Sequence, residues 1–281
     1  MQVNRLSDAL GAEVTGIDVA SVSDDDFDAI HAAWLEHEVL VLRDQELTPE
    51  QHIAFSKRFG DLEVHISVDH LLEGYPEIMM VSNKQENGRF IGAVSAGDYW
   101  HSDLSCNAHP TKASLLYSLE LPSFGGDTEW ADMYAAYETL PEKTKQRIQG
   151  LSGIHSWNRM RNPRVHVPEV HNDDAEMRYG ERAPDDSLHP IVRTHPETGR
   201  KALYVSPRFT LGVDGLENDE AQELLGELFA HQARRDFVFH HKWSLGDLVL
   251  WDNRCTVHFA CGGHTETRHM HRTSVAGDVP F

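Results

Sequence analysis

The sequence predicts a β-sandwich or jelly roll with helices packed outside its sheets. Strand-like segments follow one another closely in the tail of the chain and recur in its middle, whereas helical patterns occur at the front and in the connections. No internal repeat or low-complexity tract interrupts this order. Because 40% of the 281 residues are hydrophobic, we expect one large domain over residues 1–281.

The front of the chain begins with a strand, a helix and a second strand. Residues 10–19 alternate enough between apolar and polar side chains to predict a strand. Ser23 precedes three consecutive aspartates, a typical capped helix start, and that helix should run to about His37. The apolar run at residues 39–42 predicts a short buried strand.

A second helix should begin at Thr48, which is followed by proline in the first turn and by Gln51 at the capping-box position. Gly60 should end it. Residues 61–97 are rich in loop-forming residues apart from the strand-like segment 78–81. Such a stretch could form a lid or a pocket wall beside a site.

The remaining segments alternate strands with connecting helices. Strands are predicted at residues 112–121, 127–130, 191–193, 201–205, 237–239, 248–251, 256–258 and 271–275, and helices at residues 133–140, 142–151 and 218–235. Residues at about 158–188 are polar, rich in charge and proline, and without a sustained period. They therefore predict an irregular insertion.

The composition argues against several classes of function. The chain carries 25 basic and 45 acidic residues, a formal charge of −20, which argues against nucleic acids and anionic membranes as partners. Cys106, Cys255 and Cys261 are odd in number and lack framework spacing, so we expect no structural disulfides. Neither a signal peptide nor about 18 consecutive apolar residues occur. We expect a cytoplasmic protein, and a homo-oligomer (dimer or tetramer).

The chemistry is concentrated at Trp100-His101-Ser102-Asp103. Side chains two apart in an extended strand share a face, so His101 and Asp103 can reach one ion. The favoured third ligand is His258, because residues 251–258 (WDNRCTVH) read as a strand, a turn and a strand that can direct its side chain inward. Two histidines and one carboxylate on one face of an octahedral ion leave three open positions, as in non-haem Fe(II) oxygenases.

The His-x-acid pattern alone is not specific, because it occurs four times in this histidine-rich chain. The competing pairs are His171/Asp173, His195/Glu197 and His264/Glu266. The first lies in the irregular insertion, where little would fix metal geometry, and the second lies in a predicted turn. The surroundings of His101 therefore decide in its favour.

Four motifs occur in a fixed order: WHSD at 100–103, GGDTEW at 125–130, WDNRCTVH at 251–258, and the arginines Arg268 and Arg272. From about Leu10 to the C-terminus the chain resembles the taurine and 2,4-dichlorophenoxyacetate dioxygenase family. The resemblance implies a double-stranded β-helix (jelly roll), Fe(II), 2-oxoglutarate as co-substrate, and O2. It also implies hydroxylation of a small anionic organic substrate, with release of succinate and CO2.

The resemblance assigns roles to individual residues. His101, Asp103 and His258 become the iron ligands. Thr128 and Arg268 become the pair that holds the distal carboxylate of 2-oxoglutarate, and the planar guanidinium suits a bidentate contact. Arg272 is the residue that would meet the acidic group of the primary substrate. The carboxylate of Asp103 favours hydroxylation, because related halogenases have a small residue there.

The substrate is a small carboxylate, sulfonate or sulfate ester. His65 falls where taurine-specific relatives place a histidine against the sulfonate. Their tyrosine three positions later is matched by Val68 and their asparagine before the metal motif by Gly97, which argues against taurine itself. Phe209 and Trp157 could supply an apolar wall for a larger, aryloxyalkanoate-like acid, although core positions suit both.

Two other classes of protein fit parts of the pattern. A zinc metallohydrolase would use three such ligands and a water molecule, but it would not need Thr128 and Arg268 in position for a second dicarboxylate. A non-catalytic jelly-roll binding protein would release no succinate with any substrate.

Overall fold

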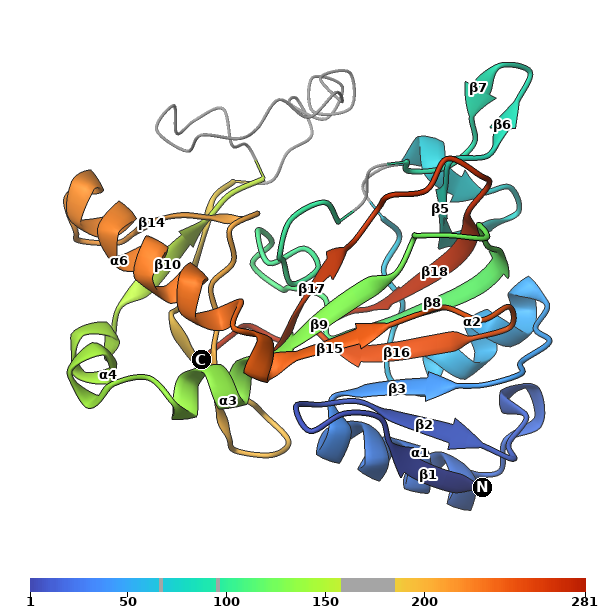
Figure 1. Ribbon diagram of the computed structural model, residues 1–281, viewed down its shortest axis with the longest axis horizontal. Helices are drawn as coiled ribbons and strands as arrows, with labels where there is room; N and C mark the ends of the chain where they lie inside the picture. Colours follow the sequence, from blue (N-terminus) through green and yellow to red (C-terminus); the bar gives the residue numbers. More distant parts are fainter. Residues whose placement is uncertain (66–67, 95–96, 158–184) are drawn as a thin grey trace.

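The computed structural model describes residues 1–65, 68–94, 97–157 and 185–281 (Figure 1). Its largest sheet, which we call the major sheet, has eight strands in the order β1-β2-β3-β16-β8-β18-β5-β4. These are β1 (Gln2–Arg5), β2 (Ala12–Thr15), β3 (Val39–Leu42), β16 (Leu248–Asp252), β8 (Ala113–Glu120), β18 (His269–Val275), β5 (Tyr75–Ser82) and β4 (Leu71–Leu72). Of these neighbours only β2 and β3 run parallel. Strands from the front, middle and tail of the chain are therefore neighbours in the major sheet.

A second sheet, the minor sheet, has the order β15-β9-β17. Its strands are β15 (Val238–His241), β9 (Thr128–Asp132) and β17 (Thr256–Ala260). Side chains from the two sheets pack together in one buried cluster: Val39, Val41, Leu116, Val249, Trp251 and Met270 from the major sheet, and Trp130 and Phe239 from the minor sheet. Two sheets facing across a shared core agree with the predicted jelly roll.

Alternation along the strands explains how the major sheet can be buried on both faces. Val39 and Val41 contribute to the core between the sheets, whereas Leu40 and Leu42 belong to a cluster on the opposite face. That opposite face is covered by α1 (Asp24–His37) and α2 (Pro49–Lys57). A continuous apolar run, as at residues 39–42, is therefore what a strand between two layers requires.

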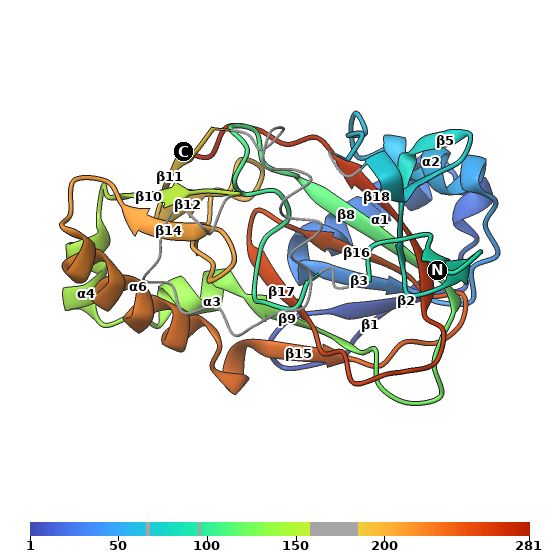
Figure 2. The same cartoon turned by 90° about the horizontal axis from the view of Figure 1, so that it is seen from above.

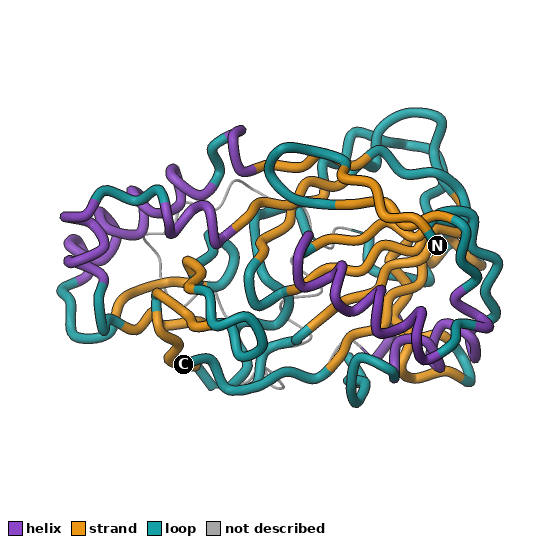
Figure 3. The backbone as a smooth tube through the Cα atoms, turned by 90° about the horizontal axis from the view of Figure 1, so that it is seen from below, coloured by secondary structure: helices purple, strands orange, loops and turns teal. Residues whose placement is uncertain are grey.

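The other helices gather at one end of the molecule, in the half opposite α2 (Figures 1, 2 and 3). They are α3 (Met133–Glu138), α4 (Glu142–Ile148) and α6 (Asn218–Gln232). They lie with a three-stranded sheet, β11 (Ser187–Pro190), β10 (Ser152–His155) and β14 (Thr210–Val213), and with the hairpin of β12 (Val192–Thr194) and β13 (Lys201–Leu203). Within the described ranges, every helix is too short or too polar to span a bilayer.

Both predicted helix starts at the front are confirmed. Ser23 accepts a hydrogen bond from the backbone of Asp26, and Thr48 and Gln51 form a reciprocal capping box. The second helix ends at Lys57 rather than at Gly60. Several other boundaries were wrong: the strand at residues 10–19 is paired only over Ala12–Thr15, the helix predicted at 142–151 ends at Ile148, and that at 218–235 ends at Gln232.

No pattern in the sequence predicted β1, a strand exposed along its whole length. The segment 61–97 also holds more structure than predicted, because β5 begins at Tyr75 and a small hairpin joins β6 (Gln85–Glu86) to β7 (Arg89–Phe90). The predicted insertion at 158–188 lies mostly outside the described residues. Its C-terminal limit was too late, since Ser187 already begins β11.

Candidate active site

His101 and His258 are brought together by the backbone rather than by their position in the sequence. The amide of His101 donates to the carbonyl of His258 at 3.0 Å, and the amide of His258 donates to the carbonyl of His101 at 2.8 Å. This reciprocal pair of bonds makes the two residues direct antiparallel partners in the middle of β17. Their rings consequently lie side by side, with centroids 4.0 Å apart.

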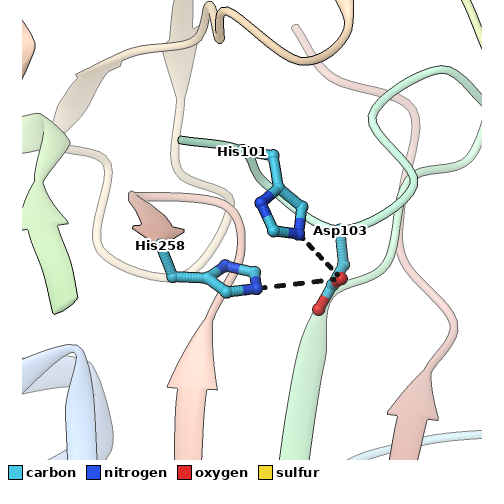
Figure 4. Close-up of side chains that lie close together, drawn as sticks. All are labelled: His101, Asp103 and His258. Carbon is cyan, nitrogen blue, oxygen red and sulfur yellow. Dashed lines mark ion pairs between the residues drawn. The ribbon is translucent and has the colours of Figure 1, made fainter. Parts of the chain in front are cut away.

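The carboxylate of Asp103 completes a three-residue group (Figure 4). Its Oδ1 atom lies 3.7 Å from Nε2 of His101 and 3.9 Å from Nε2 of His258. Asp103 stands in a turn directly after the bridge, not in a strand. One nitrogen from each ring and one carboxylate oxygen therefore lie within 4.8 Å of one another, and all three residues are buried.

The ring orientation of His101 is fixed by its other nitrogen. Nδ1 lies 2.7 Å from the carbonyl oxygen of Tyr99, and because a carbonyl can only accept, Nδ1 carries the proton. The unprotonated Nε2 then points at Asp103. Burial lowers the pKa of both His101 and His258, so both rings are neutral near pH 7.

Asp103 is ionised, because the neighbouring Arg272 and the two histidines outweigh the effect of burial and hold its pKa well below the usual range. Its carboxylate is also held by hydrogen bonds. Oδ2 accepts from the Ser114 hydroxyl at 2.7 Å, and Oδ1 accepts from Nη1 of Arg272 at 3.0 Å. Two neutral imidazoles and one carboxylate are the donor set that a hard or borderline divalent cation prefers.

Asn253 fixes the turn that carries Asp103. Its side-chain oxygen accepts from the Asp103 amide at 3.0 Å, and its side-chain nitrogen donates to Ser114 at 3.0 Å. Its carbonyl accepts from the Ser102 hydroxyl at 2.6 Å. Asn253 and Ser114 are both fully buried. The sequence analysis missed both: Asn253 lay inside the quoted WDNRCTVH motif, whereas Ser114 gave no signal.

Thr128 and Arg268 both contact Trp243. The Trp243 indole donates to the Thr128 hydroxyl at 3.0 Å, and the Arg268 guanidinium carbon lies 5.7 Å from the centre of the Trp243 ring. Nε of Arg268 donates to the Gly126 carbonyl at 3.1 Å, and no acceptor among the described residues takes its two terminal nitrogens. Burial lowers the pKa of Arg268 only to about 10, so the side chain is cationic. Trp243 was also missed by the sequence analysis.

Gly126 leaves no room for a side chain at this point. A Cβ atom there would lie 3.0 Å from Cδ of Arg268, and the backbone has a φ of +77°, which favours glycine. The GGDTEW motif therefore does two things: its second glycine lets Arg268 pack against the backbone, and its threonine contacts Trp243.

The structure brings Arg272 to the site as well. Besides its contact with Asp103, the Nη2 atom lies 3.3 Å from the sulfur of Met79, and Nε is buried without a partner among the described residues. Arg268 stands just before β18 and a register shift follows at His269/Met270. The two arginines therefore hold separate positions, one beside Trp243 and one beside Asp103.

The residues predicted to contact substrate lie around the same group. The His65 imidazole is half-buried, and burial together with Arg272 lowers its pKa to about 3. The Phe209 ring is buried, with its centre 6.2 Å from that of His101 and 6.1 Å from that of Trp157. Arg208, which the sequence analysis passed over, stacks on Phe209 at 4.8 Å.

Residues of two other His-x-acid pairs make structural contacts, and the third pair lies outside the described residues. His195 is 3.0 Å from Asp252, and Glu197 pairs with Arg254, so this turn is tied to the WDNRCTVH segment. Glu266 caps the backbone of Ser123. His171 and Asp173 lie outside the described residues.

Comparisons with known proteins agree with this geometry. The family model of the taurine catabolism dioxygenase TauD, TfdA family matches residues 2–274. The (S)-phenoxypropionate/alpha-ketoglutarate-dioxygenase of Sphingobium herbicidovorans is 35% identical over 97% of this chain and 94% of its own length. The alpha-ketoglutarate-dependent 2,4-dichlorophenoxyacetate dioxygenase of Cupriavidus pinatubonensis is 35% identical over 79% of this chain and 78% of its own.

Solved structures share the fold. The crystal structure of AAD-2 in complex with Mn(II) and N-oxalylglycine superimposes with a TM-score of 0.82, at 32% identity over 99% of both chains. A taurine dioxygenase from Burkholderia xenovorans gives a TM-score of 0.81 at 34% identity, over 99% of this chain and 90% of that one. These likenesses confirm the predicted jelly roll and the resemblance drawn from the four motifs. The chain belongs to the taurine catabolism dioxygenase TauD, TfdA family of enzymes.

Proposed function

We propose that this protein is an Fe(II)- and 2-oxoglutarate-dependent dioxygenase that hydroxylates a small anionic organic substrate. The observation that carries the proposal is the buried convergence of His101, Asp103 and His258, with their donor atoms within 4.8 Å of one another. Relatives named as alpha-ketoglutarate-dependent dioxygenases support the same reaction class and favour it over a zinc hydrolase or a non-catalytic binding protein.

The three donors fit Fe(II). Both rings are neutral, His101 presents an unprotonated Nε2, and Asp103 is ionised, so a divalent cation meets three available electron pairs. When bound, Fe(II) supplies the reaction with O2 that decarboxylates 2-oxoglutarate to succinate and CO2 and hydroxylates the substrate. Ser114 and Asn253 keep the carboxylate in place for this task.

Thr128 and Arg268 would hold the co-substrate. A hydroxyl and a guanidinium with two terminal nitrogens available can bind one carboxylate of a dicarboxylate. Trp243 fixes the Thr128 hydroxyl through its indole N–H and covers one side of Arg268. Because both residues are buried, the ion pair with 2-oxoglutarate would be screened little by water.

Arg272, His65 and Phe209 would bind the primary substrate. Arg272 is buried, and its Nε has no partner among the described residues, so it can pair with an acidic group of the substrate. Phe209 and Trp157 offer an aromatic surface beside His101. Relatives named for phenoxypropionate, 2,4-dichlorophenoxyacetate and sulfate esters support a carboxylate, sulfonate or sulfate ester, and the aromatic surface favours an aryloxyalkanoate. A single domain, a homo-oligomer and a cytoplasmic location stay predictions.

The test is an anaerobic titration of the Fe(II)-loaded protein with 2-oxoglutarate, followed by visible absorption. We expect the weak metal-to-ligand charge-transfer band of the ternary complex to appear, and to be absent in His101→Ala. Organic acids are then screened by succinate formation, with 2-phenoxypropionate and taurine as the aromatic and aliphatic extremes. A folded, iron-loaded protein that gives no band would overturn the proposal.

A further inference from the structure

A second group of metal-binding side chains lies on the outer surface of the minor sheet. Thr128 and Trp130 of β9 face inward to the site and the core, so the alternation of the strand turns Asp127 and Glu129 outward. His240 of β15 stands directly opposite Glu129, and the amide of Cys261 donates to the carbonyl of Asp127 at 2.9 Å. Four potential ligands from three adjacent strands therefore share one face.

The donor atoms of three of these residues converge. One donor atom each from Glu129, His240 and Cys261 lie within 4.8 Å of one another, the same limit that the buried triad meets. Nδ1 of His240 is 3.2 Å from Oε1 of Glu129. Among the described residues no hydrogen bond involves the Cys261 thiol. We call Glu129, His240 and Cys261 the outer cluster.

Asp127 supplies the support that a histidine ligand needs. Its carboxylate lies 2.9 Å from Nε2 of His240, the nitrogen that faces away from Glu129. A carboxylate that accepts from one nitrogen of an imidazole fixes the ring and leaves the other nitrogen for a metal, an arrangement common around bound zinc. The outer cluster therefore has an orienting residue as well as three donors.

The charges allow a dication to enter. Glu129 pairs with Arg235, whose side chain is 77% exposed and can move away at little cost. A divalent ion would displace the proton of the Cys261 thiol to solvent, and the resulting thiolate and the Glu129 carboxylate would together balance the charge of the ion. His240 is half-exposed and Cys261 is partly buried, which leaves the cluster open to an ion from solvent.

We propose that Glu129, His240 and Cys261, with Asp127 as the orienting residue, form a second metal site, separate from the active site, for a borderline divalent cation such as Zn²⁺. A mixed set of sulfur, nitrogen and oxygen ligands suits Zn²⁺ and Co²⁺ and disfavours Mg²⁺ and Ca²⁺, which take oxygen ligands only. The fourth position is open to water.

Titration of the metal-free full-length protein with Co²⁺ separates the two sites. His101, Asp103 and His258 contain no sulfur, so thiolate-to-cobalt charge-transfer absorption in the near ultraviolet would not come from Co²⁺ in the active site. We expect two equivalents of Co²⁺ to bind and the charge-transfer band to require Cys261. Cys261→Ser should remove the band and His240→Ala should weaken this site at least about 10-fold. His109→Ala, which removes another exposed histidine, should change neither.

A second measurement uses the unaltered protein. Zn²⁺ should slow alkylation of Cys261, followed by mass spectrometry of its peptide, and Mg²⁺ should not. The proposal is overturned if excess Co²⁺ produces no thiolate band, if the band survives in Cys261→Ser, or if Zn²⁺ leaves the alkylation rate unchanged. A surviving band would point to the buried Cys255, which lies beside His195 and Asp252.

Discussion

The buried triad and the outer cluster have the same number of donors at the same separation, yet their surroundings differ. His101, Asp103 and His258 are each less than 10% exposed, whereas the His240 side chain is 51% exposed. Around Asp103 the polar neighbours Ser114, Asn253 and Arg272 are buried too. The outer cluster has one orienting carboxylate and a mobile arginine. Donor atoms thus converge in both the triad and the outer cluster. Only in the triad are these donors supported by buried hydrogen-bonding residues.

The histidines of the two groups also differ in the direction of their pKa shifts. Burial lowers the pKa of His101 and His258, while Asp127 and Glu129 outweigh burial and raise the pKa of His240. The triad is therefore ready for a cation at neutral pH, whereas the Cys261 thiol, whose pKa burial raises to about 11, must first release its proton. The difference teaches that burial of the histidines and the charge of Arg272 beside Asp103 together prepare the triad for a metal in advance.

The largest effect should come from removing a ligand of the triad. His101→Ala should lower succinate formation by more than about 100-fold, because losing a ligand should exceed the 10- to 100-fold that loss of a supporting residue typically causes. The measurement is succinate release at saturating Fe(II), with His109→Ala as the control. If His101→Ala kept an activity within 10-fold of that of the unaltered protein, the triad would not be needed for catalysis. The functional distinction between the triad and the outer cluster would then be lost.

The supporting layer is tested by Asn253→Ala. This change removes the acceptor of the Asp103 amide and the partner of Ser114. We expect Fe(II) affinity to fall by about 10- to 100-fold. The corresponding change at the outer cluster, Asp127→Asn, keeps an oxygen acceptor and is more exposed, so Co²⁺ affinity there should fall by less. Equal losses of metal affinity at both sites would show that burying the supporting residues does not strengthen metal binding.

Arg268 donates to the Gly126 carbonyl and has the Asp127 carboxylate nearby. Arg268→Ala should weaken 2-oxoglutarate binding by about 10- to 100-fold, the value of a buried charged hydrogen bond. Substrate affinity should be spared. Arg272→Ala should give the reverse pattern. If Arg272→Ala abolished 2-oxoglutarate binding and spared substrate, the two assignments would have to be exchanged.

A separate effect concerns the pH dependence of stability. Burial lowers the pKa of His155 to about 3, against about 6.5 in an unfolded chain. Between these values the unfolded state binds the extra proton, so this residue costs stability as the pH falls, by about 1.4 kcal/mol per pH unit. Urea unfolding at pH 6, 5 and 4 should show a shallower decline in His155→Asn by that amount.

His240 should behave in the opposite way. Its pKa is raised in the folded state, so its stabilising effect is present below about pH 6.5 and is lost as the pH rises through the folded value. The effect should be small because the ion pairs are exposed to solvent. His240→Ala should therefore lower the stability by a small, constant amount below about pH 6.5, and this loss should shrink as the pH rises above that value. Equal stability of His240→Ala and the unaltered protein at pH 6 would contradict this prediction, and a slope for His155→Asn equal to that of the unaltered protein between pH 6 and 4 would contradict the previous one.

The fold could be predicted where one physical signal dominates. The helix caps at Ser23 and Thr48 and the apolar run at residues 39–42 each depend on local chemistry, and each was confirmed. Two helix ends were wrong: Gly150, with a φ of +76°, lies inside the helix predicted at 142–151, and Arg234, whose backbone is extended, lies inside the helix predicted at 218–235. The exposed β1 was missed because pairing with β2 gives no apolar period.

The residues of the proposed active site also divide into those that the sequence predicted and those that it did not. Residues proposed to carry the chemistry, such as His101 and Asp103, were predicted because their motifs resemble those of a family, and the structure places these two beside His258. Ser114 and Trp243 were missed because a serine in one strand and a tryptophan in a loop acquire their meaning only from their neighbours across the fold. The bond between Asn253 and the Asp103 amide spans 150 positions of sequence.

The alternation of β9 has a thermodynamic consequence. One short strand presents Thr128 to the proposed co-substrate site on its inner face and Glu129 to the outer cluster on the other. If a cation on one side shifts the strand, the affinity for 2-oxoglutarate on the other side changes by some factor, and 2-oxoglutarate must change the affinity for the cation by the same factor. The five residues of β9 would then couple the two sites. The concentration of the cation around the protein would determine the concentration of 2-oxoglutarate that the enzyme needs.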